Sequence, residues 1–127
     1  MKILNYTPND VNLYSGAEYD SETRKYKGGN IIRTFPSIGI LNARMEEITE
    51  FVREDDIIFK HKRIVSFSCD DLPSQLENTD TYLIVTRVYF EVAKQKGWDV
   101  SHLLIVGEGA VVDDTGRIVG AAFLTMN

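Results

Sequence analysis

The sequence predicts a β-rich α+β fold, a β-sandwich decorated with one main α-helix. Short apolar and β-branched runs bounded by turn residues recur along the chain, as is typical of strands. One late segment combines a helix N-cap, an apolar face and a C-terminal glycine. Strands and helices do not alternate as a doubly wound parallel sheet requires. The 127 residues are enough for one domain, so residues 1–127 are expected to share a single core.

The first two thirds of the chain are predicted to consist of strands and turns. Residues 2–7 and 11–14 are expected to be short strands separated by a turn at Pro8. Residues 15–30 are polar and contain a glycine pair, which predicts a mobile excursion or a ragged hairpin. Further strands are expected at 31–35, 38–48, 57–59 and 63–68, with an acidic turn at 51–56 and a connection at 60–62.

The main helix is predicted to follow a strand at residues 82–85. Thr86 is a suitable N-cap, and the apolar face ends at a basic segment closed by Gly97. Adjacent helical residues diverge by about 100°, so at most one of Tyr89 and Phe90 is expected in the centre of the core. The other is expected to cover a nucleobase or a partner subunit.

The C-terminal segment predicts a β-hairpin. Two apolar, β-rich runs, 103–112 and 118–124, flank Asp113-Asp114-Thr115-Gly116-Arg117, which has the aspartate and glycine content of a turn. The glycines of Leu104-Ile105-Val106-Gly107-Glu108-Gly109 suggest a dinucleotide-binding loop. A strand and a turn follow them in place of the required helix, so a bulge or bend between strands is the favoured interpretation.

Composition excludes several functional classes. The net charge of −5 and the isoelectric point of about 5.0 argue against a duplex-DNA binder. The single cysteine, Cys69, cannot form an internal disulfide, and we expect neither secretion nor membrane insertion, because no apolar run has the required length. His61 and His102 lack neighbours at zinc-binding spacing. No metal or other cofactor is therefore expected.

Candidate catalytic groups have simpler structural explanations. The acidic pairs at 55–56, 70–71 and 113–114 all lie beside predicted turns, where aspartates accept hydrogen bonds from the local backbone. Cys69 as a nucleophile would need His61 or His102 as its base, and a packing role is favoured. Arginines are better candidates for ligand binding, because a guanidinium group binds a phosphate bidentately. They lie in predicted strands, at the helix start and after the hairpin turn: Arg33, Arg44, Arg63, Arg87 and Arg117.

Five short segments together carry a family resemblance. They are TPNDVNLY near the start, the stretch from Pro36-Ser-Ile-Gly39 to Ala43-Arg44, Asp71-Leu72-Pro73, YLIVTRVYFEVA at 82–93 and VVDDTGRIVGAA at 111–122. In this order they resemble the phage Thoeris anti-defence sponges of the first described type. The resemblance extends over most of the chain, although each segment is short and moderately specific.

The resemblance implies an immunoglobulin-like β-sandwich with an added helix. It also implies a homodimer or an assembly of dimers in the cytoplasm of the infected bacterial host. Proteins of this family sequester cyclic ADP-ribose isomers, made by a TIR-domain enzyme, in pockets at the dimer interface without cleaving them. Some members also bind cyclic di- or trinucleotides of the CBASS immune pathway at a separate site. The chain is therefore expected to be a nucleotide-binding protein and not an enzyme.

The resemblance transfers roles to a few matched positions. Arg117 is expected to contact a phosphate, and the pocket wall is expected to contain Thr86, Arg87, Tyr89 and Phe90. Arg44 lies within another matched segment and is a further candidate ligand-binding residue. Asp113 stands where a second basic residue is expected, and its charge would repel a pyrophosphate unless it faces a ribose hydroxyl.

Two other functions are consistent with the sequence. One is a nucleotide-cleaving enzyme that uses the pair Asp113 and Asp114. The other is a small phage structural or adaptor protein that binds a protein partner through an exposed strand edge. A sponge needs affinity and not transition-state complementarity, so it requires no nucleophile, metal cluster or activated base.

Overall fold

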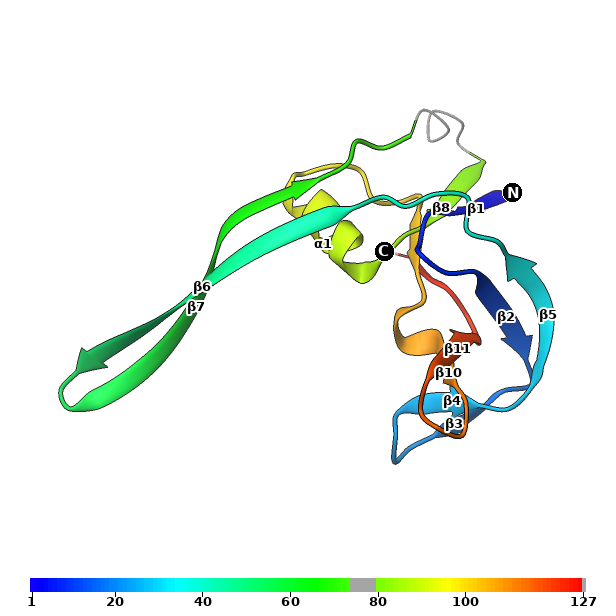
Figure 1. The fold of residues 1–127 in the computed structure, drawn as a ribbon, viewed down its shortest axis with the longest axis horizontal. Coiled ribbons are helices and arrows are strands. Elements are labelled where there is room, and N and C mark those ends of the chain that lie inside the picture. The colour runs from blue at the N-terminus through cyan, green and yellow to red at the C-terminus, as the bar shows by residue number, and fades with distance from the viewer. Residues whose placement is uncertain (74–79, 127) are drawn as a thin grey trace.

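A computed structural model describes residues 1–73 and 80–126 and has a β-rich α+β fold, as predicted (Figure 1). The strands of this part of the chain are β1 (Lys2–Asn5), β2 (Val11–Ser15), β3 (Glu18–Asp20), β4 (Lys25–Lys27), β5 (Asn30–Phe35), β6 (Ala43–Glu54), β7 (Ile57–Cys69), β8 (Thr81–Ile84), β9 (Leu103–Ile105), β10 (Ala110–Val112), β11 (Ile118–Ala121) and β12 (Thr125–Met126). The α-helix is α1 (Arg87–Gln95), and a 3-10 turn, η2, spans Gly107–Gly109.

The strands form two sheets and a separate two-stranded ribbon. The four-stranded sheet has the order β1-β8-β9-β12, and the six-stranded sheet has the order β3-β4-β10-β11-β2-β5. Apolar side chains from both sheets meet in one cluster: Val11 and Phe35 pack with Ile84 and Leu104. A second cluster lies on the other side of the four-stranded sheet, against α1. Strands β1, β8 and β9 are parallel, which differs from the antiparallel sheets of immunoglobulin domains. The immunoglobulin-like topology stays a prediction of the resemblance.

Helix α1 begins where the sequence predicts. Thr86 is its N-cap, and the Thr86 hydroxyl accepts a 3.2 Å hydrogen bond from the backbone N–H of Tyr89. The prediction for the core was wrong, because Tyr89 and Phe90 are both buried. The reason is that α1 is covered on two sides, by the four-stranded sheet and by the base of the β6–β7 ribbon. Because α1 connects two parallel strands, β8-α1-β9 is a βαβ unit, and the expectation of no such alternation was also wrong.

The β6–β7 ribbon, called the arm below, was predicted incorrectly. Residues 38–42 lie outside the strand expected at 38–48, and β6 continues to Glu54 in place of the acidic turn expected at 51–56. Strand β7 runs without interruption through residues 60–62. The turn is reduced to Asp55 and Asp56, whose φ angles of 50° and 65° are those of a tight hairpin turn. Most of both strands is exposed (Figure 1), so charged residues occur on both faces of the arm. The alternation of apolar and polar residues that would predict a strand is therefore missing.

The two ends of the chain add smaller corrections. The polar region 15–30 contains the short β3–β4 hairpin, so the ragged-hairpin alternative was the better prediction. β1 ends at Asn5, and β12 was not anticipated. The β10–β11 hairpin is confirmed, with Val112 paired to Ile118. The 3-10 turn at Gly107–Gly109 confirms a bend within the run 103–112.

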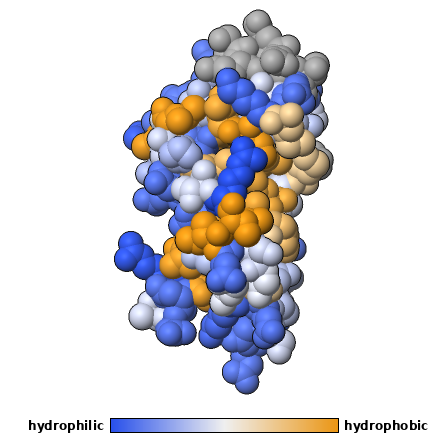
Figure 2. Space-filling model, turned by 90° about the vertical axis from the view of Figure 1, so that its right-hand side faces the viewer, coloured by the Kyte–Doolittle hydropathy of each residue, from blue (hydrophilic) through white to orange (hydrophobic). Residues whose placement is uncertain are grey.

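Apolar side chains also remain exposed on the body. Figure 2 shows a band of them across the face of the body that lies opposite the arm. Four exposed isoleucines belong to β5 and the segment that follows it: Ile31, Ile32, Ile38 and Ile40. In the part of the chain described, no helix has the length and apolar character needed to cross a membrane.

Candidate ligand-binding cleft

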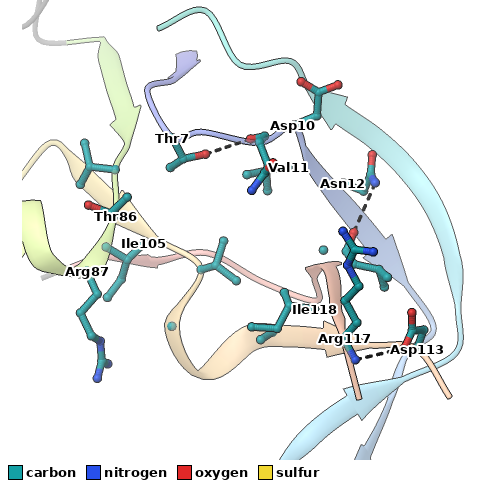
Figure 3. Close-up of a pocket in the computed structure, with 17 residues that line it drawn as sticks. Thr7, Asp10, Val11, Asn12, Thr86, Arg87, Ile105, Asp113, Arg117 and Ile118 are labelled. Carbon is teal, nitrogen blue, oxygen red and sulfur yellow. Dashed lines mark hydrogen bonds between the residues drawn. The ribbon is translucent and has the colours of Figure 1, made fainter. Parts of the chain in front are cut away.

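A cleft of about 730 Å³ opens between the two sheets (Figure 3). Its walls come from the loop before β2, the ends of β8 and β9, the start of α1 and the β10–β11 hairpin. The lining residues include Thr7, Asp10, Asn12, Thr86, Arg87, Ile105, Gly107, Asp113, Arg117 and Gly120. Three regions that are distant in the sequence therefore contribute to one concave surface.

The position of the cleft follows from the βαβ unit. Thr86 and Arg87 come directly after β8, and Val106 and Gly107 come directly after β9. Both strands are parallel, so their carboxyl ends meet at the same edge of the sheet. This edge is where parallel α/β sheets bind ligands, since it lacks a covering helix and leaves backbone groups accessible. Gly107 adopts a φ of +47°, which allows the chain to turn sharply below the cleft.

Asn5 anchors the N-terminal wall, a role that the sequence analysis missed. Its side chain is 1% exposed, and its amide donates hydrogen bonds to the carbonyl oxygens of Asn9 at 2.9 Å and Phe35 at 2.8 Å. Its Oδ1 accepts from the Thr7 backbone N–H at 3.0 Å and from the Thr7 hydroxyl at 2.6 Å. These contacts fix the loop that carries Asp10 beside the cleft. The available signal was a polar residue that interrupts an otherwise apolar strand pattern and precedes a proline turn.

The opposite wall is fixed by Asp113. Its Oδ1 accepts hydrogen bonds from the Thr115 hydroxyl at 2.6 Å, the Thr115 backbone N–H at 2.9 Å and the Arg117 backbone N–H at 3.0 Å. These bonds, first of all that from the Thr115 hydroxyl, lower the pKa of Asp113. Asp113 therefore stabilises the hairpin turn, as the turn interpretation predicts, and brings a negative charge close to Arg117.

The two arginines of the cleft lie on different walls. In Figure 3 the side chain of Arg117 extends from the hairpin toward β2. The side chain of Arg87, at the start of α1, points away from β2. Within residues 1–73 and 80–126, neither side chain forms an ion pair. Both positive charges are therefore available to an anionic ligand.

The structure brings together four of the seven predicted site residues. Thr86, Arg87, Asp113 and Arg117 all line the cleft. Tyr89 and Phe90 do not: both are buried in the core beneath the arm. Arg44 lies at the base of the arm, in a separate hollow of about 410 Å³ with Asn42, Ser68 and Asp70.

The buried position of Tyr89 gives it a structural role. Its hydroxyl donates a 2.8 Å hydrogen bond to the Asp70 carbonyl oxygen, which ties α1 to the end of β7. Burial raises the pKa of the Tyr89 phenol, so the hydroxyl stays protonated and continues to donate.

The alternative nucleophile is not assembled with His61. Cys69 and His61 lie eight residues apart on the extended strand β7, which corresponds to roughly 26 Å. The ring of His102 lies against Tyr82, with 5.0 Å between the ring centroids. Desolvation raises the pKa of the Cys69 thiol, which disfavours the reactive thiolate. Within the described ranges, no group of three His, Cys, Asp or Glu side chains is arranged to bind a metal ion.

No family model, curated protein or solved structure matches this chain. The cleft itself therefore carries the functional argument. It is a concave site with Arg87 at the carboxyl end of the parallel strand β8 and Arg117 on the facing β10–β11 hairpin, and within the described residues neither guanidinium group forms an ion pair.

Proposed function

We propose that the chain is a phage anti-defence sponge that binds a cyclic ADP-ribose isomer without cleaving it and so blocks Thoeris-type immunity in the host cytoplasm. The observation that carries this proposal is the cleft, which exposes Arg87 and Arg117 from two different walls. Each guanidinium group can bind phosphate oxygens in a bidentate manner, so a pyrophosphate-bearing ring would have a cationic partner on each of two walls. The sequence resemblance supplies the ligand class.

The hydrogen bonds of the cleft favour binding over cleavage. The Asp10 carboxylate accepts a 2.8 Å hydrogen bond from the Ser37 backbone N–H, and Asp113 is engaged in its own turn. The Thr86 hydroxyl caps α1. The side chains that would be candidates for acid–base or nucleophilic chemistry thus serve the fold, and they make the walls rigid. A rigid cleft suits a sponge, because preorganisation reduces the entropy lost when the ligand binds.

The required affinity is within reach of the contacts available. Charge-assisted hydrogen bonds contribute about 1.5–3 kcal/mol each, and nanomolar binding corresponds to about 12 kcal/mol. Two arginines and the backbone groups at the ends of β8 and β9 therefore supply much of the total. The negative charge of Asp113 reduces the affinity for a phosphate at Arg117, unless the second carboxylate oxygen of Asp113 accepts a hydrogen bond from a ribose hydroxyl.

Alanine substitutions test this proposal. Arg87→Ala and Arg117→Ala are expected to abolish capture of a cyclic ADP-ribose isomer while the protein stays folded. Arg53→Ala, on the exposed end of the arm, is the matched control and should retain capture. Full capture by both cleft variants would remove these arginines from the site. Competition with cyclic di- and trinucleotides in the same assay tests the second ligand class.

We further propose that the sponge is a homodimer assembled through the arm. A two-stranded ribbon is at best marginally stable alone in water, yet the arm exposes eight large apolar side chains. They are Phe51, Val52, Ile57, Ile58, Phe59, Ile64, Val65 and Phe67. The register places Val52, Ile57 and Phe59 together on the face opposite Ala43, and covering this patch favours association.

The charges on the arm favour a second copy as the partner. Strand β6 carries four glutamates and two arginines, whereas β7 carries three cations and no carboxylate. On the face that carries Val52, the register places Glu46, Glu50 and Glu54 of β6 and Arg63 of β7. Two arms related by a two-fold axis parallel to the strands place β6 of each over β7 of the other, so these glutamates face the strand that carries Arg63.

The face that remains open is also defined by the register. Ala43 and Cys69 pack on the core beneath α1, and alternate strand residues point to opposite faces. Val52 and its cross-strand partner Phe59 therefore point to the face that α1 leaves open.

Light scattering tests the dimer. The native chain is expected to be a dimer, and Val52→Lys combined with Phe59→Lys is expected to give a folded monomer. Ile31→Lys on β5 is the control and should remain dimeric, because Ile31 is exposed on the body. A monomeric native chain would refute the dimer, and a stable complex with another phage protein would then favour the adaptor function.

A further inference from the structure

A second hollow, called the aromatic hollow here, lies beside the cleft. Its volume is about 620 Å³. It is lined by Tyr19, Arg24, Lys25, Tyr26, Arg87, Gly107, Glu108 and Phe123. Arg87 and Gly107 also line the cleft, so the two hollows are neighbours that share one cation. No sequence motif indicated this site.

Three aromatic rings form a row along the aromatic hollow. The ring centroids of Tyr19 and Tyr26 are 5.3 Å apart, and those of Tyr26 and Phe123 are 5.7 Å apart. The interplanar angles of 62° and 86° mean that the rings meet edge to face. Tyr19 is 56% exposed and Phe123 is 42% exposed. Exposed aromatic surface of this kind is available to stack on a planar group.

The positions of the rings are set by the sheet. Tyr26 lies in β4, which pairs with β10 at Val111, and Tyr19 is its cross-strand partner in β3. Phe123 lies against Gly109, where an added Cβ would overlap the Phe123 carbonyl oxygen. The row is thus built from the β3–β4 edge hairpin and from the segment between β11 and β12, which packs against the end of the 3-10 turn.

Positive charge surrounds the rings. Arg24 ends the β3–β4 turn, Lys25 begins β4, and Arg87 comes from the start of α1. Across the ranges that the structure describes, none of these three side chains forms an ion pair. Glu108 is the one carboxylate among the residues lining the hollow. The hollow therefore has a local excess of two positive charges in a chain with a net charge of −5.

We propose that the aromatic hollow binds the base of a nucleoside phosphate, with the phosphate at Arg87 and Arg24. This deepens the proposed function and rests on it where the ligand is a cyclic ADP-ribose isomer, whose phosphates would lie at Arg87 and whose adenine would stack on Tyr19 or Phe123. Glu108 accepts a hydrogen bond from an exocyclic amine or a ribose hydroxyl. Aromatic faces, cations and an acceptor together suit a nucleotide better than a bare anion.

Calorimetry with three probes tests the aromatic hollow directly: AMP, ribose 5-phosphate and inorganic phosphate. Stacking of one base contributes about 1–3 kcal/mol, so the native chain is expected to bind AMP about 5- to 150-fold more tightly than ribose 5-phosphate. Tyr19→Ala combined with Phe123→Ala should remove this preference and leave the affinity for ribose 5-phosphate unchanged. Arg24→Ala should weaken the binding of both organic phosphates.

Two further variants separate stacking from folding. Tyr19→Phe retains the ring and should retain the AMP preference, and Ile31→Ala removes an exposed apolar side chain of β5, outside both the aromatic hollow and the arm, and should have no effect. Equal affinities of the native chain for AMP and ribose 5-phosphate would overturn the proposal. So would a preference that survives the double alanine substitution.

The outcome is distinguishable from that of the proposed function. Capture of a cyclic ADP-ribose isomer that is indifferent to Tyr19→Ala and Phe123→Ala would refute the aromatic hollow and retain the sponge. A ring-dependent preference for AMP without such capture would support the hollow and refute the sponge.

Discussion

Asn5 is the residue whose substitution should damage the cleft most. Asn5→Ala removes four hydrogen bonds, of which the bond to the Phe35 carbonyl oxygen is fully buried. Net hydrogen bonds contribute about 0.5–1.5 kcal/mol each, and a buried carbonyl left unsatisfied costs about 1–3 kcal/mol. Three partly buried bonds and one buried bond therefore give a loss of about 3 kcal/mol. For a domain of this size, that loss lowers Tm by roughly 10 °C.

Thermal unfolding followed by circular dichroism measures this effect, with Thr7→Val as the graded comparison. Thr7→Val removes one hydroxyl near Asn5 and Asn9, so its cost should be about 1 kcal/mol. If Asn5→Ala lowers Tm by less than about 3 °C, or by no more than Thr7→Val does, the anchoring role is refuted.

Asn5→Asp adds a test by pH. The introduced carboxyl would face two carbonyl oxygens in a buried site, so its folded-state pKa would be raised above about 3.9. The folded state would then bind the proton more tightly than the unfolded state. The instability of this variant relative to the native chain should shrink between pH 8 and pH 4. A constant difference across this range would contradict the geometry.

Three further predictions concern stability. The lowered pKa of Asp113 means that its charge stabilises the fold above about pH 4 and ceases to do so as the pH falls through the folded-state pKa. The Tm values of Asp113→Asn and the native chain should therefore converge at acid pH. A difference in Tm that widens at acid pH would contradict this role. Thr86→Ala should lose about 1 kcal/mol in urea unfolding while Thr86→Ser loses less, and equal losses would argue against the N-cap. Tyr89→Phe should lose about 1 kcal/mol in the same measurement through the missing bond to Asp70, and an unchanged midpoint would show that this bond contributes nothing.

The elements with local signals were predictable from the sequence. The Thr86 cap, the Gly97 end and the aspartate-glycine turn of the last hairpin are set by local backbone chemistry, and the structure has all three. The arm was not predictable in the same way. Both of its faces are largely exposed, so the burial that produces a clean alternation of apolar and polar residues is missing.

The site was partly predictable for a related reason. Thr86, Arg87, Asp113 and Arg117 lie beside the predicted helix start and turn, and the fold brings these two features to one cleft. The burial of both Tyr89 and Phe90 depends on the arm base covering a second side of α1, a long-range contact that helical spacing cannot reveal. Asn5 and the aromatic hollow likewise depend on pairings between distant segments.

Capture of an intact ligand tests the central claim most directly. The purified protein is mixed with the products of a TIR-domain enzyme, separated by filtration and heat-denatured, and the released nucleotides are analysed by mass spectrometry. The account predicts that a cyclic ADP-ribose isomer is depleted from the mixture and recovered unchanged. The double variant Arg87→Ala with Arg117→Ala is expected to show neither depletion nor recovery. No depletion would contradict the proposed ligand class, and recovery of a cleaved product would contradict sequestration.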